Sequence, residues 1–353
     1  MLHGVPGILS EAQVAQSVHY LAHLQLPSGL VPWYPGGHSD PWNHVECAMA
    51  LTAAGDHDAA AAAYDWLERH QLGDGSWFNY YVGEHVKDSR LDTNVCAYVA
   101  AGVYHFLVVT EDVDAVVRWW PMVERAMDFV VRWQRSDGSV GWSLDARGVP
   151  ESYALLTGSS SIYHSLRCAV ALAERLDFHR PSWELAAGRL GHALAHHPES
   201  FAPKVEYAMD WYYPVLSGAM LDTAATARIA TDWGRFVVED RGVRCVSNHD
   251  WVTAAETAEA VLTLDAVGHG SRALELLACT NRHRIDDGSY LTGIVYPQRQ
   301  TFPDLETTSY TAAAILLAVD AVTDSSPGAS LFRHGVLTDT LDWPEPGCEV
   351  AAR

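Results

Sequence analysis

The fold is decided by a stretch of the chain that reads DPWNHVECAMALTAAG at residues 40–55. An aspartate stands before a proline, which suits the first position of a helix. Residues 47–54 are then small or apolar around the whole helix, and a glycine ends it. A helix without a polar face is typical of burial on all sides. The stretch therefore predicts an inner helix that begins at a polar loop.

The same change from polar loop to apolar helix recurs six times, beginning near residues 41, 92, 157, 211, 251 and 306. Between these helices, apolar residues recur at helical spacing with charges on the opposite face, roughly at 11–25, 57–71, 116–134, 181–197, 224–238 and 270–284. Six buried helices that alternate with six half-exposed ones predict an all-α (α/α)6 toroid, with six inner helices ringed by six outer helices.

Loop lengths orient this toroid. Connections from outer to inner helices are long, whereas the reverse connections are short, as at Gly55-Asp56. Long loops in a compact domain are more often functional than idle, and the inner-helix N-termini on the same face favour carboxylates and polar ligands. We expect the site on that face of a single catalytic domain, residues 1–323, with residues 324–353 as an extended tail packed on the toroid.

Composition limits the partners and the compartment. The 44 acidic and 23 basic residues give a formal charge of −21, which disfavours nucleic acid and anionic membranes. No targeting pattern precedes the first helix and no apolar run approaches 18 residues, so we expect a cytoplasmic protein. Six sparse cysteines indicate core residues rather than a disulfide framework. The one weak metal grouping is Cys245 with His249 and Asp250, and we expect neither a metal nor an organic cofactor.

The outer helices end in a repeated signature, QLGDGSW at 71–77 and QRSDGSVGW at 134–142. Asp-Gly supplies the left-handed residue that stops a helix. The signature resembles the Gln-x-x-x-Gly-x-Trp repeats of squalene cyclase and prenyltransferase toroids, which implies the fold but not the chemistry. The Asp-x-Asp-Asp acid motif and the Asp-rich magnesium motif of those enzymes do not occur. A terpene cyclase or prenyltransferase is therefore the alternative reading.

Aromatic residues and carboxylates interleave along the expected site face. They include Trp33, Trp42, Trp77, Trp142, Trp211 and Trp251 beside Asp40, Glu46, Asp92, Asp210, Glu256 and Glu306. Sugar faces stack on indole rings, and two carboxyl groups can cleave a glycosidic bond. Any single tryptophan is also an ordinary packing residue, so the interleaving carries the argument for a sugar ligand.

Two of these acids are the candidate catalytic residues. Asp40 follows two glycines and precedes Pro41, so it is either a helix N-cap or a catalytic group. Glu256 lies one turn into an otherwise small and apolar helix, where an ionised glutamate is costly without a role. The remaining candidates are expected to bind substrate, although the acids among them could also cap helices: Trp33, His38, Trp42, His44, Trp77, Asp92, Asp210, Trp211, Tyr212, Trp251 and Glu306.

Four segments resemble an actinobacterial toroid family usually labelled prenyltransferase, and the similarity covers nearly the whole chain. They are residues 33–42, 155–161, 208–214 and 251–257. One branch of this family consists of endo-α-mannosidases of methylmannose polysaccharide. In that branch the catalytic pair is a loop aspartate and a glutamate on a later inner helix. The resemblance implies that these two residues are Asp40 and Glu256 in this chain.

We therefore expect an intracellular glycoside hydrolase that cleaves internal α-mannosidic bonds of a methylated mannan. The family analogy implies inversion, with one acid, one base and a water between them. Glu256 is expected to donate the proton and Asp40 to activate the water, with exchange of these roles left open. A non-catalytic glycan-binding toroid is a third possibility, and the oligomeric state is left open.

Overall fold

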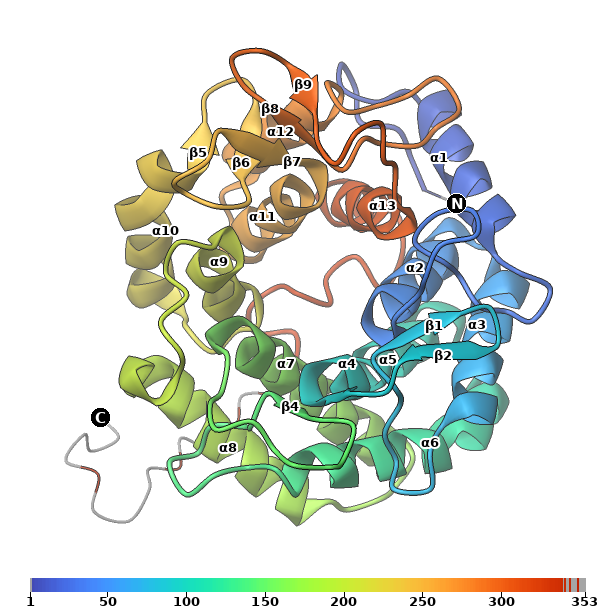
Figure 1. Cartoon of the computed structure of the whole chain (residues 1–353), viewed down its shortest axis with the longest axis vertical. Helices are drawn as coiled ribbons and strands as arrows, with labels where there is room; N and C mark the ends of the chain where they lie inside the picture. Colours follow the sequence, from blue (N-terminus) through green and yellow to red (C-terminus); the bar gives the residue numbers. More distant parts are fainter. Residues whose placement is uncertain (1, 339, 341–342, 344–347, 349–353) are drawn as a thin grey trace.

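The computed structural model describes residues 2–338, 340, 343 and 348. Within this part of the chain, helices form two concentric rings (Figure 1). The inner ring contains α2 (Pro41–Ala54), α4 (Thr93–Ala97) with α5 (Val99–Thr110), α7 (Leu156–Arg175), α9 (Ala208–Leu216), α11 (Ala254–Ala266) and α13 (Ser309–Thr323). The outer ring contains α1 (Glu11–Leu24), α3 (His57–His70), α6 (Val113–Val131), α8 (Pro181–His196), α10 (Asp222–Phe236) and α12 (Gly270–Thr280).

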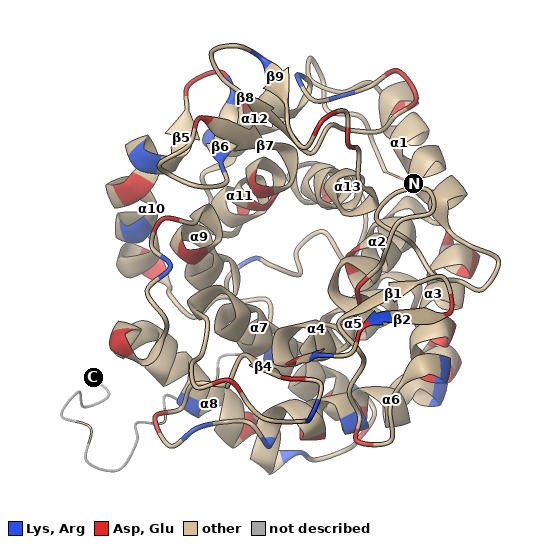
Figure 2. Cartoon of the chain, in the orientation of Figure 1, with Lys and Arg blue, Asp and Glu red and all other residues tan. Residues whose placement is uncertain are grey.

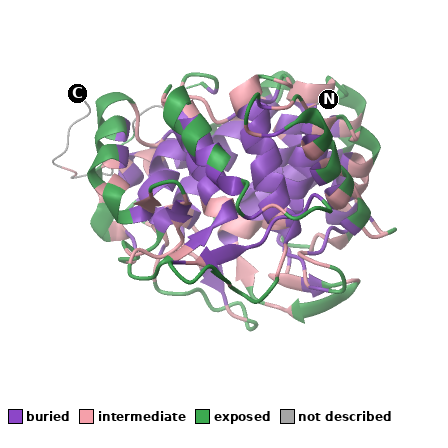
Figure 3. Ribbon diagram, turned by 90° about the horizontal axis from the view of Figure 1, so that it is seen from above, coloured by how far each residue is buried: buried purple, intermediate pink, exposed green. Residues whose placement is uncertain are grey.

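The inner helices pack in chain order and close on themselves. Helix α2 contacts α5, α5 contacts α7, and the series continues through α9 and α11 to α13, which packs against α2. Each outer helix packs on the inner helix beside it in the chain. The inner helices are buried and the outer helices expose one side, as Figure 3 shows. Residues 47–54 are apolar around the whole helix because α2 has neighbours on every side.

Helices α4 and α5 act as one inner helix. Only Tyr98 separates them, and it keeps helical dihedral angles (φ −65°, ψ −19°). The combined span Thr93–Thr110 is long and apolar enough to cross a membrane by length and composition, contrary to the expectation from sequence. Two-thirds of it (67%) is buried inside the protein. Its apolar character is accounted for by its place in the inner ring.

The long loops carry three small antiparallel sheets, so the expectation of an all-α chain is wrong in this respect. Strand β1 (Tyr80–Val82) pairs with β2 (His85–Asp88), and β3 (Leu91–Asp92) pairs with β4 (Ser143–Leu144). A five-stranded sheet has the order β5 (Val237–Val238), β6 (Gly242–Arg244), β7 (Trp251–Thr253), β8 (Gly293–Val295), β9 (Gln300–Thr301). Strands of two to four residues are too short to show a period of two in the sequence.

The repeated glutamine signature joins consecutive outer helices. Gln134 Nε2 donates to Gly138 O of its own turn (3.0 Å) and to Ala186 O of α8 (2.8 Å). Gln71 makes the same two bonds, to Gly75 O and to Met122 O of α6, both at 2.9 Å. The structural role predicted for the signature is confirmed.

Only glycine fits the turn of this signature. Gly75 has φ 97°, and a Cβ atom there would lie 2.1 Å from the carbonyl oxygen of Arg125 on α6. The left-handed conformation and the close approach of two backbones therefore both exclude a larger residue.

The chain after α13 was expected to be an extended tail packed on the outside of the toroid, but its first part packs against the inner helices. Phe332 stacks on His164 of α7, with ring centroids 4.7 Å apart. Arg333 Nε donates to Asp265 of α11 (2.7 Å), and His334 Nε2 bonds Val215 O of α9 (2.8 Å). Residues 324–338 thus cross the end of the ring opposite the long loops and form its floor (Figure 1). Most of the predicted tail beyond residue 338 lies outside the described residues.

We expect Gln134→Ala to lower the free energy of unfolding by about 1–3 kcal/mol, because it removes two hydrogen bonds worth about 0.5–1.5 kcal/mol each. Denaturant unfolding followed by circular dichroism measures this change. Gln298→Ala, at an exposed position, is the matched control and should leave the unfolding midpoint unchanged. Equal midpoints for both variants would show that the signature does not support the ring.

Candidate active site

A cavity of about 270 Å³ opens within the ring, at the end where the inner helices begin. Aromatic and carboxyl side chains line it together with small apolar residues. The aromatic residues are Trp33, Trp42, Tyr213, Trp251 and Tyr310, and the carboxyl groups are Glu46, Glu256 and Glu259. Figure 2 shows acidic residues on α9 and α11 close to the centre of the ring. The site lies on the face that loop lengths predict.

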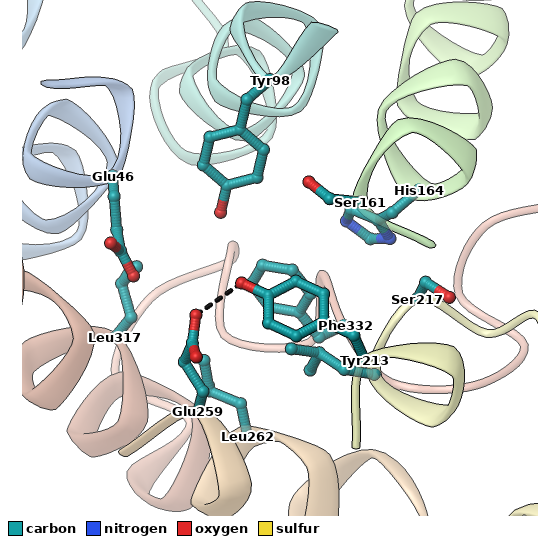
Figure 4. A pocket seen from close by; sticks show the side chains of 11 residues that line it. Glu46, Tyr98, Ser161, His164, Tyr213, Ser217, Glu259, Leu262, Leu317 and Phe332 are labelled. Atoms are coloured by element: carbon teal, nitrogen blue, oxygen red, sulfur yellow. Dashed lines mark hydrogen bonds between the residues drawn. The ribbon is translucent and has the colours of Figure 1, made fainter. Parts of the chain in front are cut away.

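A second, deeper cavity of about 20 Å³, with room for about one water molecule, continues from the first. The two share Glu46, Tyr213 and Glu259, which stand at the boundary between them. Below these residues lie His164 and Phe332, so the floor segment after α13 closes the deep cavity (Figure 4). Carboxyl groups therefore lie at the mouth of a narrow and largely apolar chamber.

Glu259 is the most constrained of these acids. It is 6% exposed, and its carboxylate accepts hydrogen bonds from the hydroxyl groups of Tyr212 and of Tyr213, the latter at 2.5 Å (Figure 4). Burial raises the pKa of Glu259 to about 7, although both tyrosine hydroxyls act in the opposite direction. A carboxyl group whose pKa lies near 7 can both donate and accept a proton at the pH of a cell.

Glu46 reaches the same cavity from α2, which only α13 separates from α11 in the inner ring. It is 4% exposed, and burial raises its pKa well above the ordinary value of 4.5, with the charge of Glu259 adding to the rise. Two carboxyl groups that face one poorly solvated space disfavour each other's ionisation. Glu46 was expected on the site face but was not among the candidate catalytic or binding residues.

Glu256 lies one turn before Glu259 on α11 and lines the outer cavity, where it is half-buried. The Cys245 thiol is beside it, and burial, together with the Glu256 charge, raises the pKa of that thiol. The spacing i, i+3 places Glu256 and Glu259 on one face of the helix. This spacing was the available signal for Glu259, which sequence reasoning missed.

Asp40 is the N-cap of α2. Its carboxylate accepts from the Asn43 backbone N–H (2.9 Å), from Asn43 Nδ2 (2.6 Å) and from Trp33 Nε1 (2.8 Å). Asp40 is 4% exposed, and burial raises its pKa while these hydrogen bonds limit the rise. Trp33 and Asn43 line the cavity directly in front of it. Asp40 is thus more buried than Glu256, although Glu256 was expected to be the proton donor.

Asp92 repeats this arrangement at the next inner helix. It caps α4 by accepting from Asn94 N (2.9 Å) and Val95 N (3.1 Å), and Trp142 Nε1 donates to it at 2.6 Å. Burial raises its pKa to about 6. A loop indole bonded to a capping aspartate is therefore shared by Asp40 and Asp92, although Trp33 precedes its aspartate and Trp142 follows its own by 50 positions.

The other predicted binding residues fall into three groups. Trp33, Trp42 and Trp251 line the cavity. His38, Asp210, Tyr212 and Glu306 stand behind residues that line it, namely Trp33, Thr157, Glu259 and Thr292. His44, Trp77 and Trp211 lie in the core, and the structure does not bring them to the cavity.

The three core residues use their polar atoms elsewhere. Both ring nitrogens of His44 bond backbone groups, Val31 N at 3.1 Å and Ala63 O at 2.9 Å. Trp77 is fully buried and Trp211 packs on Phe236. His44 and Trp211 lie near the starts of inner helices, and Trp77 lies in the turn signature after α3, but none of the three lines the cavity.

The weak grouping of Cys245, His249 and Asp250 does not converge. Asp250 pairs with Arg244 (3.2 Å), and His249 Nδ1 contacts the side chain of Asn248 (2.6 Å). Among the described residues, the set that could hold a metal ion lies elsewhere, at His192, His197 and Cys348.

Comparison with known proteins gives the class. No family model matches the chain. Solved structures of similar fold include a glycosidase in complex with glucose (TM-score 0.68, 14% identity, 90% of this chain and 100% of that chain) and a D-mannose isomerase (TM-score 0.63, 13% identity, 91% and 100%). At such identities the likeness shows the fold alone.

A relative from Mycolicibacterium hassiacum, an MMP endo-(1,4)-3-O-methyl-α-D-mannosidase, is 48% identical over 330 residues, which cover 94% of this chain and 91% of the relative. Together with a barrel whose cavity is lined by carboxyl and aromatic groups, this identity defines a glycoside hydrolase. The chain belongs to the family of that endomannosidase. The sequence-based expectation of a glycosidase of this family is confirmed.

The raised pKa of Glu259 predicts a pH-dependent stability. Between the ordinary value of 4.5 and about 7, the unfolded chain is ionised while the folded protein keeps the proton. The contribution of Glu259 to the free energy of unfolding is therefore fully present below pH 4.5 and is lost as the pH rises to 7. At 1.36 kcal/mol per pKa unit, the loss is about 3 kcal/mol. Glu259→Gln, which stays neutral, should flatten this part of the profile.

Unfolding free energies at pH 5 and pH 7.5 for both proteins test the prediction. Glu239→Gln, at an exposed position, is the control and should follow the unaltered protein. Parallel profiles for Glu259→Gln and the unaltered protein would show that Glu259 does not hold its proton at neutral pH.

Proposed function

We propose that the protein cleaves internal α-mannosidic bonds of a 3-O-methylated mannan, and that its fold is an (α/α)6 toroid elaborated by loop sheets. The observation that carries the substrate class is the 48% identity, over nearly the whole chain, to an endomannosidase of that specificity. A cytoplasmic location and the absence of a catalytic cofactor stay predictions from the sequence.

The surfaces of the cavity support a carbohydrate. Trp42 is held flat against Tyr98, with ring centroids 4.4 Å apart and planes at 14°, and its Nε1 donates to Ser161 Oγ at 3.2 Å. The Nε1 of Trp251 is bonded to Phe302 O (3.0 Å). Indoles fixed in this way present faces on which sugar rings can stack without losing further side-chain entropy.

The polar and apolar lining fits a methylated sugar. Asn43, Asn94 and Thr292 offer hydrogen-bonding groups for hydroxyls, while Met209 and Ala314 offer apolar surface for O-methyl groups. Methylation removes a hydroxyl donor and adds apolar area. A cavity that alternates the two kinds of surface can therefore select for partial methylation.

Charge disfavours the isoprenoid alternative. The described residues that line the outer cavity include three glutamates and neither lysine nor arginine. A diphosphate needs cationic partners or metal ions, and carboxylates alone would repel it. A neutral oligosaccharide meets no such penalty.

For the reaction, we propose Asp40 and Glu256 as the catalytic pair, with roles assigned by their exposure. Asp40 is enclosed and its pKa is raised by burial, which suits a proton donor to the leaving oxygen. Glu256 is open to the cavity and can bind and deprotonate water. An inverting hydrolysis needs this division between one acid and one base.

We expect Asp40→Asn and Glu256→Gln each to reduce hydrolysis of the polysaccharide by at least about 100-fold, since general acids and bases typically contribute 10²–10⁴. Asparagine is also a good N-cap, so the fold should be retained. Asp92→Asn is the matched control, because it changes an equivalent capping aspartate bonded to a tryptophan. Near-normal turnover in Glu256→Gln would remove Glu256 from the pair and direct attention to Glu259→Gln.

The roles are separated with a mannoside whose leaving group needs no protonation, such as a nitrophenyl glycoside. Loss of the acid is then largely compensated, whereas loss of the base is not. We expect Asp40→Asn to recover most of its rate on this substrate and Glu256→Gln to stay slow. The opposite recovery pattern would exchange the two roles.

Ligand class is tested by thermal shift. Methylated mannooligosaccharides should raise the melting temperature of Glu256→Gln and change its tryptophan fluorescence, because binding is retained while cleavage is blocked. Geranylgeranyl diphosphate with magnesium should do neither. A shift with the diphosphate alone would contradict the proposed substrate.

A further inference from the structure

A group of metal-binding side chains lies on the outer ring, separate from the residues that line the cavity. His192 is on α8, His197 directly follows α8, and Cys348 belongs to the C-terminal segment. The Sγ atom of Cys348 lies 3.4 Å from His192 Nε2 and 3.2 Å from His197 Nε2. All three ligand atoms are within 4.8 Å of one another.

The two sulfur-to-nitrogen distances match the edges of a zinc coordination polyhedron. Zinc binds thiolate at about 2.3 Å and imidazole nitrogen at about 2.0–2.1 Å. For angles between 90° and the tetrahedral value, the sulfur and nitrogen ligands are then about 3.1–3.6 Å apart. Both observed separations fall in this range.

The local backbone brings the two histidines together. Positions 192 and 197 would not share a face of a continuous helix, because five residues turn it by about 500°. The chain leaves the helix at His197, where φ is −127° and ψ is 62°, and this redirects the ring. His192 is 3% exposed, so one ligand is already fixed in the packed outer ring.

A carboxylate orients the second histidine. His197 Nδ1 lies 3.0 Å from Glu199 Oε1. A carboxylate on one ring nitrogen keeps the proton there and leaves the lone pair of the other nitrogen for a metal, an arrangement common around zinc-bound histidines. Nε2, the nitrogen that faces Cys348, is thus the one prepared for coordination.

The path of the C-terminal segment delivers the cysteine. Arg167 Nη2 of α7 donates to Leu337 O (2.8 Å), and the Tyr163 hydroxyl bonds Thr340 Oγ1 (2.8 Å). Trp343 then lies among residues of α7 and α8. The described points of the segment lead from the floor of the ring to the C-terminal end of α8, where Cys348 meets the two histidines.

We propose that His192, His197 and Cys348 bind one Zn²⁺ ion, which fastens the C-terminal segment to α8. Two neutral imidazoles and one thiolate supply three ligands, and the Cys348 thiol releases its proton to solvent on binding. A water molecule completes the tetrahedron. The site is structural: it ties down the segment that follows the floor of the cavity, and it provides no group to the cavity itself.

The test uses the full chain without a polyhistidine tag, stripped of metal, mixed with excess ZnCl₂ and passed through gel filtration. Mass spectrometry of the metal should give about one zinc per chain. We expect Cys348→Ser, which removes only the thiolate, to retain below about a fifth of that amount under the same treatment. His197→Gln should lose zinc in the same way.

Exposed histidines on α1 provide the matched control. His19 and His23 are stacked at 4.0 Å, and such a pair can hold zinc adventitiously. The double variant His19→Gln/His23→Gln should retain one zinc. Loss of zinc in this double variant, retention of zinc by Cys348→Ser, or no zinc in the unaltered chain would each overturn the proposal.

Two further readouts apply even if a variant is destabilised. Cobalt(II) bound in place of zinc should give a thiolate-to-metal charge-transfer absorption in the unaltered chain, and this band requires Cys348. Zinc should also protect the C-terminal segment from limited proteolysis, and a chelator should remove the protection. Cobalt binding without the thiolate band would place the metal elsewhere and contradict the assignment.

Discussion

The contact between α13 and α2 joins the last inner helix to the first, and the rest of the structure depends on this closure. Six helices that pack side by side in a ring must each be apolar on nearly all sides, yet their common centre stays unfilled. Side chains that point into this centre lose water without gaining a full set of packing partners. The ring therefore creates a space of low polarity, and polar groups placed there are perturbed.

The glutamates on α2 and α11 show this effect. In water, Glu46 and Glu259 would be ionised well below neutrality, but in the ring burial raises the pKa of both. The hydroxyl groups of Tyr212 and Tyr213 replace part of the hydrogen bonding that Glu259 would receive from water. Both tyrosines are consecutive residues of α9. The helix that supplies them is thus as important to the site as the helix that carries the acid.

The sequence predicted those features that a short stretch encodes. The glutamine-glycine turn was recognisable because its residues are adjacent, and the capping position of Asp40 followed from Pro41. Features that need two distant segments were not predictable. The indole that bonds Asp92 belongs to Trp142. The hydroxyl groups that bond Glu259 belong to Tyr212 and Tyr213, which precede it by 47 and 46 positions. His44 and Trp211 were misplaced because sequence alone does not give the rotation of a helix about its axis, and Trp77 because its loop packs on α3, where its Nε1 donates to Leu67 O.

The same reasoning explains why the catalytic assignment changed in detail but not in its residues. Asp40 was expected to stay ionised because a helix start favours a negative charge. In the structure, Trp33 and Asn43 cover it, so its hydrogen bonds favour the charged form while the loss of solvent opposes that form more strongly. Glu256, in contrast, is half-buried and lines the outer cavity. In the proposed mechanism, exposure rather than the polarity of the neighbouring sequence therefore assigns the proton donor and the proton acceptor.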